Sequence, residues 1–419
     1  MKFSHKKSGS VLLALSMLAA LTACGTTKSL DTADAASETA AVTSTAPVTT
    51  DGATDVRDLF TDRDLNQTPD LSDAVHETLS DGDTLTITDA GVYILSGDAE
   101  NAQVIVETAD DAKVQLVLDG LTVTNDDAPV IYVKNADKVF VTTTDSENAL
   151  SVTGAFSSDG DTNTDAVIFS KDDLVLNGVG TLAISSTDNG VSCKDDLKVT
   201  GGAYVIDCVS DALEANDSIS IAGGDFTITT DKDGLHCEND EDDTEGNIYI
   251  CGGTFDITAK SDGIQGTTVT QIDGGTFTIT ASECIESTYV QINGGTFTLY
   301  GTDDGINASR KSTAVSVCIE ITGGDISITM AQGDTDAIDA NGSIIVSGGS
   351  IDITAQFAFD FDTTAEHTGG TITVNGETVD EITESMMMGG MMGGPGGMQG
   401  GPGGFGGPGG GMGGPGHGG

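Results

Sequence analysis

Hydrophobic and polar residues alternate with a period of two on both sides of a recurring Gly-Gly dipeptide. The dipeptide begins at residues 201, 223, 252, 274, 294, 323, 348 and 369, in contexts such as ISIAGGDFTI, VQINGGTFTL and IIVSGGSIDI. Alternation of this kind is typical of strands that bury one face, and the glycines mark the turn between two of them. Each unit of about 22 residues therefore contains two short predicted strands.

A third strand completes each unit. Beyond each Gly-Gly, an acidic residue is followed by a small residue and an aliphatic one, as in DAL from Asp211, DGI from Asp262 and ECI from Glu283. Three strands and three turns are the perimeter of one coil of a parallel β-helix. We therefore expect an all-β solenoid of roughly a dozen coils over residues 81–382.

Two rows of residues fall on the predicted buried positions. Aromatic residues lie three positions after the first glycine of the dipeptide, at Tyr204, Phe226, Phe255, Phe277 and Phe297. Their alternation partners are aliphatic, which favours stacking inside the coils over a row of sugar-stacking platforms. Six cysteines occupy apolar or small positions without a CxxC pair, which favours buried free thiols over disulfides; they are Cys193, Cys208, Cys237, Cys251, Cys284 and Cys318.

The two ends differ from the repeat. Residues 1–24 join a basic start and an apolar run to LTAC, which predicts a lipoprotein signal with lipidation at Cys24; an ordinary secretory signal is the alternative. Residues 25–55 predict a disordered tether, and residues 56–80 lack alternation and predict a cap over the open end. Residues 383–419 predict a disordered Gly/Met/Pro tail, for which a Cu(I) site is the less favoured interpretation. We expect a monomer on the extracellular face of a bacterial membrane, attached by its N-terminal lipid only.

The charge of the chain limits its partners. With 66 acidic and 16 basic residues the net charge is −50, which argues against nucleic acid, anionic lipid and any unassisted polyanion. A surface of this kind attracts cations.

Because equivalent positions of successive coils lie above one another, acidic positions become ladders. The first ladder is Asp211, Asp233, Asp262, Glu283, Asp304 and Asp336. The second, three residues on, is Glu214, His236, Gln265, Glu286, Asn307 and Asp339, and a third is Asp172, Asp195 and Asp217. Carboxylates about 5 Å apart repel each other, so the side chains splay into water, or each acid caps its own turn, or calcium lies between the rungs of these ladders. Zinc is not expected, because the five histidines are scattered singly.

Two coils carry extra residues at the same turn. From the ladder acid to Gly-Gly there are 11 or 12 residues in most coils, but 19 in those starting at Asp233 and Asp304. Insertions on one flank often mark a binding face. ENDEDDTEG (238–246) is acidic, and ASRKSTAV (308–315) carries Arg310 and Lys311, which are candidates to bind a uronate carboxylate; a solvated loop and an incidental basic turn are the alternative. Neighbouring acids extend the candidate calcium ligands to Asp231, Asp240, Asp242, Asp243, Asp303 and Asp334.

The runs IYVKNADKVFVT, FSKDDLVLNGVGTL, GVSCKDDLKVTGGAYVI and DGLHCENDEDDTEGNIYICGGTFDIT resemble the clostridial "carbohydrate-binding domain-containing" β-helix proteins, over roughly residues 80 to 376. The resemblance implies a right-handed β-helix similar to pectate lyases, calcium along the coils, and binding of polygalacturonate without established lyase activity. It also implies calcium ligands among the first-ladder acids and the KDD pairs Asp172, Asp173, Asp195 and Asp196. Glu283, Ser192 and Gln265 depart from the family pattern, and their coils are expected to lack a site.

Three functions remain in view. A non-catalytic, calcium-dependent module that binds an acidic plant cell-wall polysaccharide is favoured. A calcium-dependent polysaccharide lyase is the alternative, with Arg310 or Lys311 as the base. The third is a structural or adhesive rod in which calcium only stiffens the coils.

Overall fold

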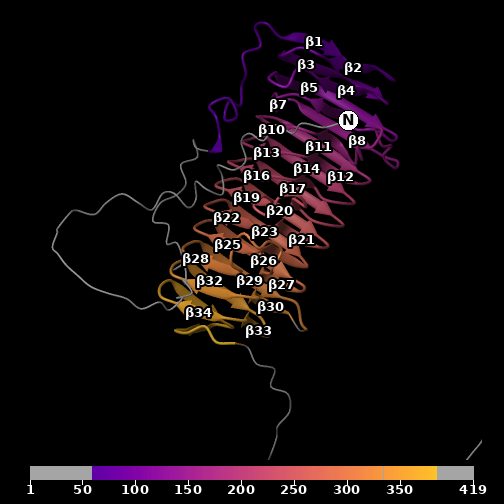
Figure 1. The fold of residues 1–419 in the computed structure, drawn as a ribbon. Helices are drawn as coiled ribbons and strands as arrows, with labels where there is room; N and C mark the ends of the chain where they lie inside the picture. The colour runs from indigo at the N-terminus through magenta and orange to yellow at the C-terminus, as the bar shows by residue number, and fades with distance from the viewer. Residues whose placement is uncertain (1–58, 334, 385–419) are drawn as a thin grey trace, which may run out of the picture. The chain divides into compact units, whose positions relative to one another are not determined.

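The computed structural model describes residues 59–333 and 335–384 (Figure 1). The expected lipid anchor at Cys24, the expected tether, residue Asp334 and the tail from residue 385 lie outside the described residues. Within the described part of the chain, no helix is long and apolar enough to span a membrane.

The described chain forms a parallel β-helix, which confirms the fold predicted from the repeat (Figure 1). Each coil contributes one strand to each of three stacks, here called columns 1, 2 and 3. Column 1 is a sheet of twelve strands, one per coil, which confirms the predicted number of coils. Its strands are β2 (Thr84–Ile87), β4 (Gln103–Glu107), β6 (Ile131–Asn135), β9 (Ala166–Ser170), β12 (Asn189–Cys193), β15 (Leu213–Ala215), β18 (Leu235–Cys237), β21 (Asp262–Gly266), β24 (Glu283–Ser287), β27 (Asp304–Ala308), β30 (Asp336–Ala340) and β33 (Phe357–Phe361).

Columns 2 and 3 form one sheet, because the long strands β3 (Gly91–Glu100) and β5 (Lys113–Asn125) belong to both. Column 2 further contains β1 (Val75–Thr78), β7 (Lys138–Thr143), β10 (Asp173–Gly178), β13 (Asp196–Val199), β16 (Ser218–Ile221), β19 (Asn247–Ile250), β22 (Val269–Ile272), β25 (Tyr289–Ile292), β28 (Cys318–Ile321), β31 (Ser343–Val346) and β34 (Thr364–His367). Column 3 further contains β8 (Glu147–Val152), β11 (Thr181–Ser186), β14 (Ala203–Cys208), β17 (Asp225–Thr230), β20 (Thr254–Ala259), β23 (Thr276–Ala281), β26 (Thr296–Gly301), β29 (Asp325–Met330), β32 (Ser350–Thr354) and β35 (Thr371–Val374). The last strand, β36 (Glu377–Val379), pairs antiparallel with β35, whereas the columns pair in parallel.

The interior of the coils holds the predicted aromatic row. Phe226, Phe255, Phe277 and Phe297 are buried, and the centroids of neighbouring rings lie 4.7 Å apart in nearly parallel planes. Tyr204 continues the stack at 5.3 Å from Phe226. Stacking of this row inside the coils is therefore confirmed, and none of these rings is available to a sugar.

The Gly-Gly dipeptide forms the turn between columns 2 and 3. Its second glycine adopts a positive φ, for example +129° at Gly224 and +121° at Gly275, which a residue with a Cβ rarely adopts. A Cβ at Gly275 would also lie 2.9 Å from the ring of Phe277. The turn therefore favours glycine at this position in every coil that carries the dipeptide, and the ring beneath it adds a second reason in the coils from Gly202 to Gly295.

The six cysteines of the repeat are free thiols, and all but the half-buried Cys251 are buried. This confirms the interpretation of these residues as small hydrophobic groups rather than disulfide partners.

Residues 59–67, here called the strap, lie along the side of column 2. Leu59 and Phe60 pack against Tyr249 of β19, and the Gln67 side chain accepts a hydrogen bond from the backbone N–H of Gly178 at 2.7 Å. The Arg63 guanidinium lies 4.4 Å from the centroid of the Phe140 ring. Residues 56–80 were predicted to cap the open end of the helix. The strap instead contacts strands from the middle of the helix, whereas β1, from the same segment, pairs with the edge of β3.

Candidate functional site

The second predicted ladder runs along column 1 in continuous register. Ser192, Glu214, His236, Gln265, Glu286, Asn307 and Asp339 pair in this order, one per coil. The first ladder follows the same strands, because Asp262 pairs with Glu283 and Asp304 pairs with Asp336. The sequence columns therefore correspond to real rows of side chains.

The first-ladder carboxylates connect neighbouring coils. Asp211 accepts a hydrogen bond from the backbone N–H of Asp233 at 3.2 Å, and Asp233 accepts one from Asp262 at 2.8 Å. Asp304 accepts the N–H of Asp336 at 3.2 Å in the same way. One oxygen of each of these acids thus caps the turn of the next coil. The acids do cap turns, but each cap joins two coils instead of closing the turn of its own coil.

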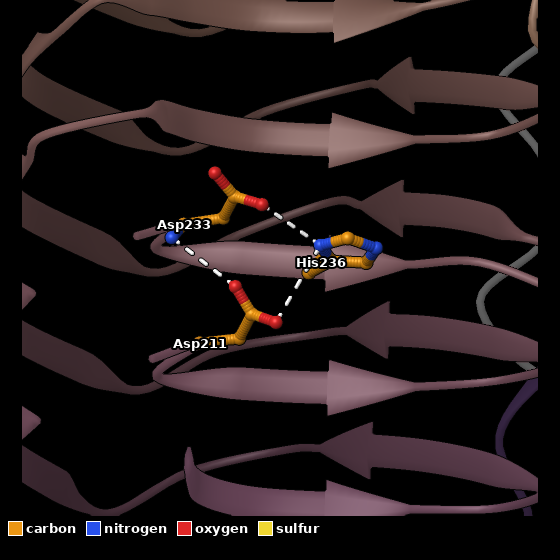
Figure 2. A group of neighbouring side chains, drawn as sticks. All are labelled: Asp211, Asp233 and His236. Atoms are coloured by element: carbon orange, nitrogen blue, oxygen red, sulfur yellow. Dashed lines mark hydrogen bonds and ion pairs between the residues drawn. The ribbon is translucent and has the colours of Figure 1, made fainter. Parts of the chain in front are cut away.

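In the N-terminal half of the ladders, here called the upper half and ending at His236, the cations are side chains of the protein itself. His236 lies between two ladder acids, with its Nδ1 2.8 Å from Asp233 Oδ2 and 3.6 Å from Asp211 Oδ2 (Figure 2). Lys232 Nζ lies 2.7 Å from Asp211 Oδ2. Burial alone would lower the pKa of His236, but the hydrogen bonds to Asp211 and Asp233 outweigh it and raise the pKa to about 10. An imidazolium and an ammonium therefore neutralise this pair of carboxylates. The residue before His236 on the second ladder, Glu214, is likewise paired with Lys194 at 3.1 Å.

The C-terminal half of the ladders, here called the lower half and running from Asp262 to Asp339, has few such cations. Carboxylate oxygens of Asp262, Glu283 and Glu286 lie within 4.8 Å of one another. Burial and then the charge of Asp233 raise the pKa of Asp262 to about 8, while burial and the charge of Glu286 raise that of Glu283 to about 7. Burial and the charge of Asp339 raise the pKa of Asp304 to about 7. Burial and the charge of Asp360 raise that of Asp339 to about 6. These shifts mean that the lower ladder binds protons more readily than isolated carboxylates do.

Asn307 adds a neutral oxygen to this lower group. Its Nδ2 donates a hydrogen bond to Glu283 Oε2 at 3.0 Å, but its buried Oδ1 has no hydrogen-bond partner among the described residues. The side chain is 7% exposed, so water does not readily replace that partner. Gln265 donates to Glu286 Oε2 at 3.0 Å. An unused oxygen beside carboxylates with raised pKa values suits a hard divalent cation.

Asp195 of the third ladder forms a separate group with two residues of the KDD pairs at the turn between columns 1 and 2. Asp173, Asp195 and Asp196 present oxygens within 4.8 Å of one another. Burial and the charge of Asp173 raise the pKa of Asp195 to about 8. Lys138 Nζ lies 3.2 Å from Asp173 Oδ2, and Asp172 Oδ2 accepts the backbone N–H of Ala136 at 3.0 Å. This group therefore has part of its charge balanced by the protein. The backbone N–H of Asp217 donates to the carbonyl of Asp195 at 3.4 Å, in line with the predicted stacking.

The two insertions lie at the same turn and contact each other. Asp243 Oδ2 accepts the backbone N–H of Thr313 at 2.9 Å and also a hydrogen bond from its hydroxyl. The Ser312 hydroxyl donates to the carbonyl of Asp243 at 2.7 Å. The insertions therefore bridge the turns of the two coils between them, where Thr268 donates to Glu245 and Thr288 accepts from Lys311.

The remaining predicted residues are distributed around this surface. Lys311 Nζ lies 2.8 Å from Glu286 Oε2, whereas Arg310 is exposed. Asp242 accepts hydrogen bonds from Thr244 within its own loop, and Asp240 is exposed. Asp231 pairs with Lys260 at 2.5 Å on the exposed surface. Neither Asp231 nor the exposed Asp303 belongs to the groups around Asp233, Asp195 and Asp262.

Two features were not anticipated from the sequence. Glu286 and Glu283 both belong to the Asp262 group, although the coil starting at Glu283 departs from the family pattern. His236 serves as an internal cation, and Lys232 supports it. The spacing of the ladders predicted the correct row for Glu286 and His236. The signal that could have identified both as members of these acidic groups is their position three residues after a first-ladder acid.

Comparisons with known proteins identify a family for most of the chain. The model of the family described as carbohydrate-binding domain-containing protein matches residues 81–335 and 285–391. A carbohydrate-binding domain-containing protein of Acetivibrio thermocellus is 34% identical over 125 residues, which are 29% of this chain and 43% of that protein. The match thus spans less than half the length of that relative. A solved structure described as the polysaccharide lyase-like protein from C. thermocellum, gadolinium derivative, is 27% identical and covers 56% of this chain and 96% of its own, with a TM-score of 0.47.

Proposed function

This chain belongs to the family of carbohydrate-binding domain-containing proteins, and from that premise we propose that it binds an acidic polysaccharide through calcium held on column 1. The proposal assigns no catalytic step to the protein. The polysaccharide is of the polygalacturonate type, whose carboxylates calcium can bridge to protein carboxylates.

The observation that carries the proposal is the uneven charge balance along the ladders. The upper half contains His236 and Lys232 among its acids, whereas Lys311 is the one cation that forms an ion pair with the Asp262, Glu283 and Glu286 group among residues 59–333 and 335–384. Adjacent carboxylates in such a row repel by about 1 to 3 kcal/mol per pair, depending on solvation. A divalent cation would offset this repulsion.

The residues present fit calcium in their chemistry. Asp262, Glu283 and Glu286 supply carboxylate oxygens, and Asn307 supplies an amide oxygen that has no other hydrogen-bond partner in the described chain. Calcium takes about six to eight oxygen ligands, so this set leaves coordination positions for a sugar carboxylate and water. Lys311 would bind a further carboxylate from the adjoining turn, where it already meets Glu286.

Titration calorimetry with polygalacturonate, in calcium and in chelator, tests the proposal. We expect heat of binding in calcium and little in chelator, and a loss of at least tenfold in affinity for Glu283→Gln and Asp262→Asn. Asp256→Asn is the matched control, because Asp256 is an exposed acid of column 3. Equal affinities with and without calcium would exclude calcium bridging.

The lyase alternative rests on the closeness of a basic side chain to the acidic ladder. Lys311 is engaged by Glu286 at 2.8 Å, which leaves Arg310 as the exposed basic residue of the insertion. Unsaturated product, detected by ultraviolet absorbance during incubation with uronans and lost in Arg310→Ala, would replace the binding proposal with lyase activity. If calcium raises the melting temperature but no glycan binds, the protein is a structural rod instead.

We also propose that Cys24 carries the lipid that holds the protein on the extracellular face of the cell membrane. The support is the LTAC box after an apolar run. Cys24→Ser should move the protein from the membrane fraction to the medium, and an unchanged distribution would contradict the lipid anchor.

A further inference from the structure

Three lysines occupy successive coils where column 1 ends, although the chain as a whole is strongly acidic. They are Lys134 on β6, Lys171 after β9 and Lys194 after β12. The backbone N–H of Lys171 donates to the carbonyl of Val133 at 3.1 Å, and that of Lys194 donates to Ser170 at 2.8 Å, which fixes the three in one row. Neighbouring members of such a row begin about 4.8 Å apart.

An aromatic pair lies beside this lysine row. Tyr132 and Phe169 pack edge to face with ring centroids 5.7 Å apart, and both rings are buried. Lys134 Nζ lies 4.9 Å and Lys171 Nζ 5.8 Å from the centroid of Tyr132, while Lys194 Nζ lies 5.7 Å from that of Phe169. Ammonium groups at these distances from aromatic faces are held in place by cation–π attraction.

The loop between β8 and β9 places a carboxylate on this group. Asp159 Oδ2 lies 2.7 Å from Lys134 Nζ and accepts a hydrogen bond from the Tyr132 hydroxyl at 3.2 Å. Thr162, from the same loop tip, accepts a hydrogen bond from Lys171 Nζ at 2.8 Å. The lysine row and Tyr132 thus bind one carboxylate and one hydroxyl, which are the groups that a uronate sugar presents.

The contact of Asp159 is one that a ligand can replace. The Asp159 side chain is 51% exposed, so the ion pair with Lys134 is open to solvent. The base of the loop is held separately, because Ser157 hydrogen-bonds Asp127 through both its backbone N–H and its hydroxyl, and Thr164 donates to the carbonyl of Ser157. Displacement of the tip around Gly160 therefore need not disturb the coils beneath it.

We propose that Tyr132, Lys134 and Lys171 form a calcium-independent subsite for one uronate residue, occupied by the Asp159 carboxylate when no sugar is bound. The choice of a uronate rests on the proposed function, whereas the carboxylate and hydroxyl chemistry rests on the contacts of Asp159 and Thr162. The subsite lies on the same row of column 1 as the cation site, because Tyr132, Phe169 and Ser192 pair in register above Glu214. Tyr132 is six coils from Glu286, or about 29 Å, so a polymer can reach both sites and a monosaccharide cannot.

The test uses galacturonate monomer in chelator, so that the cation site is silent. Binding is measured as protection of lysines against acetylation, with peptide mass spectrometry as the readout. We expect galacturonate to protect Lys134 and Lys171 and galactose to protect neither. Lys260, which pairs with Asp231 on an exposed surface, is the internal control and should react equally in all samples. Equal acetylation of Lys134 and Lys171 with and without galacturonate would overturn the subsite.

Two variants separate ligand binding from support of the loop. Asp159→Ala removes the internal competitor and should strengthen galacturonate binding at least threefold, whereas a purely structural ion pair would give no gain. Lys171→Gln, which leaves the Lys134 and Asp159 pair intact, should weaken galacturonate binding at least threefold, and unchanged binding would contradict its role. Since all these measurements are made in chelator, their failure leaves calcium-dependent polymer binding standing, and failure of the calcium experiment leaves them unaffected.

Discussion

The carboxylate of Asp233 accepts a hydrogen bond from the backbone N–H of Asp262 at 2.8 Å, across two neighbouring coils. The same side chain meets His236 Nδ1 at 2.8 Å through its other oxygen. One buried acid therefore joins two coils and holds an internal cation, which makes the first ladder part of the scaffold in its upper half.

Asp233→Ala should lower the stability of the protein strongly. The change removes the acceptor of the Asp262 N–H and leaves His236 with one fewer partner, at a cost of about 2 to 4 kcal/mol. Asp233→Asn keeps an oxygen for the N–H and should cost less than Asp233→Ala. Urea unfolding followed by circular dichroism checks the order, and equal midpoints for the two variants would contradict the bridging role.

His236 should make stability depend on pH. Its pKa is raised from 6.5 to about 10 in the folded protein, so its contribution is fully present below pH 6.5 and is lost as pH rises through 10. His236→Gln should lower the melting temperature at pH 6 and flatten its decline between pH 6.5 and 10. The exposed His76 on β1 offers the control His76→Gln, which should leave the profile unchanged. A wild-type profile in His236→Gln would show that the imidazolium does not contribute.

The aromatic stack should dominate the packing energy of column 3. Phe277 is buried between Phe255 and Phe297, and Phe277→Ala leaves a cavity that costs about 3 to 5 kcal/mol. Thr278→Ala, an exposed position on the same strand, should change the unfolding free energy by less than about 0.5 kcal/mol. Similar unfolding midpoints for both variants would mean that the stack adds little to stability.

The contact between the two insertions should protect them from proteolysis. Asp243→Ala removes two hydrogen bonds to Thr313, so cleavage by an acid-specific protease within residues 238–246 should become several-fold faster. Because these bonds are exposed, the unfolding free energy of the whole protein should change little. Asp240→Ala, in the same loop, is the control, and equal cleavage rates for the two variants would show that the insertions are not held by Asp243.

The repeat made much of this architecture predictable. Once Gly223 and its equivalents fix the turn, the position of a residue relative to them determines its column and its face, which is why the register of Asp262 with Glu283 follows from spacing. The same argument placed both insertions at one turn before their contact was known. Periodicity supplies these results because each coil repeats the hydrogen bonds of the previous one.

Other features have no periodic signal. The pairing of Lys232 and His236 with Asp211 depends on side-chain rotamers at single positions, which spacing does not specify. The contact of Asp243 with Thr313 joins loops three coils apart, and the strap meets column 2 through residues such as Gln67 that match no repeat. These contacts are set by tertiary packing. The sequence therefore shows which side chains could form them but not which partner each one meets.

The strap also imposes an order of events on biogenesis. Leu59 and Phe60 leave the ribosome before Tyr249, against which they pack, so their partner does not exist until almost two hundred further residues have been made. Until then these two apolar side chains lack the partner that buries them in the folded protein. The strap can therefore close over the middle of the helix only after the coil that carries Tyr249 has formed.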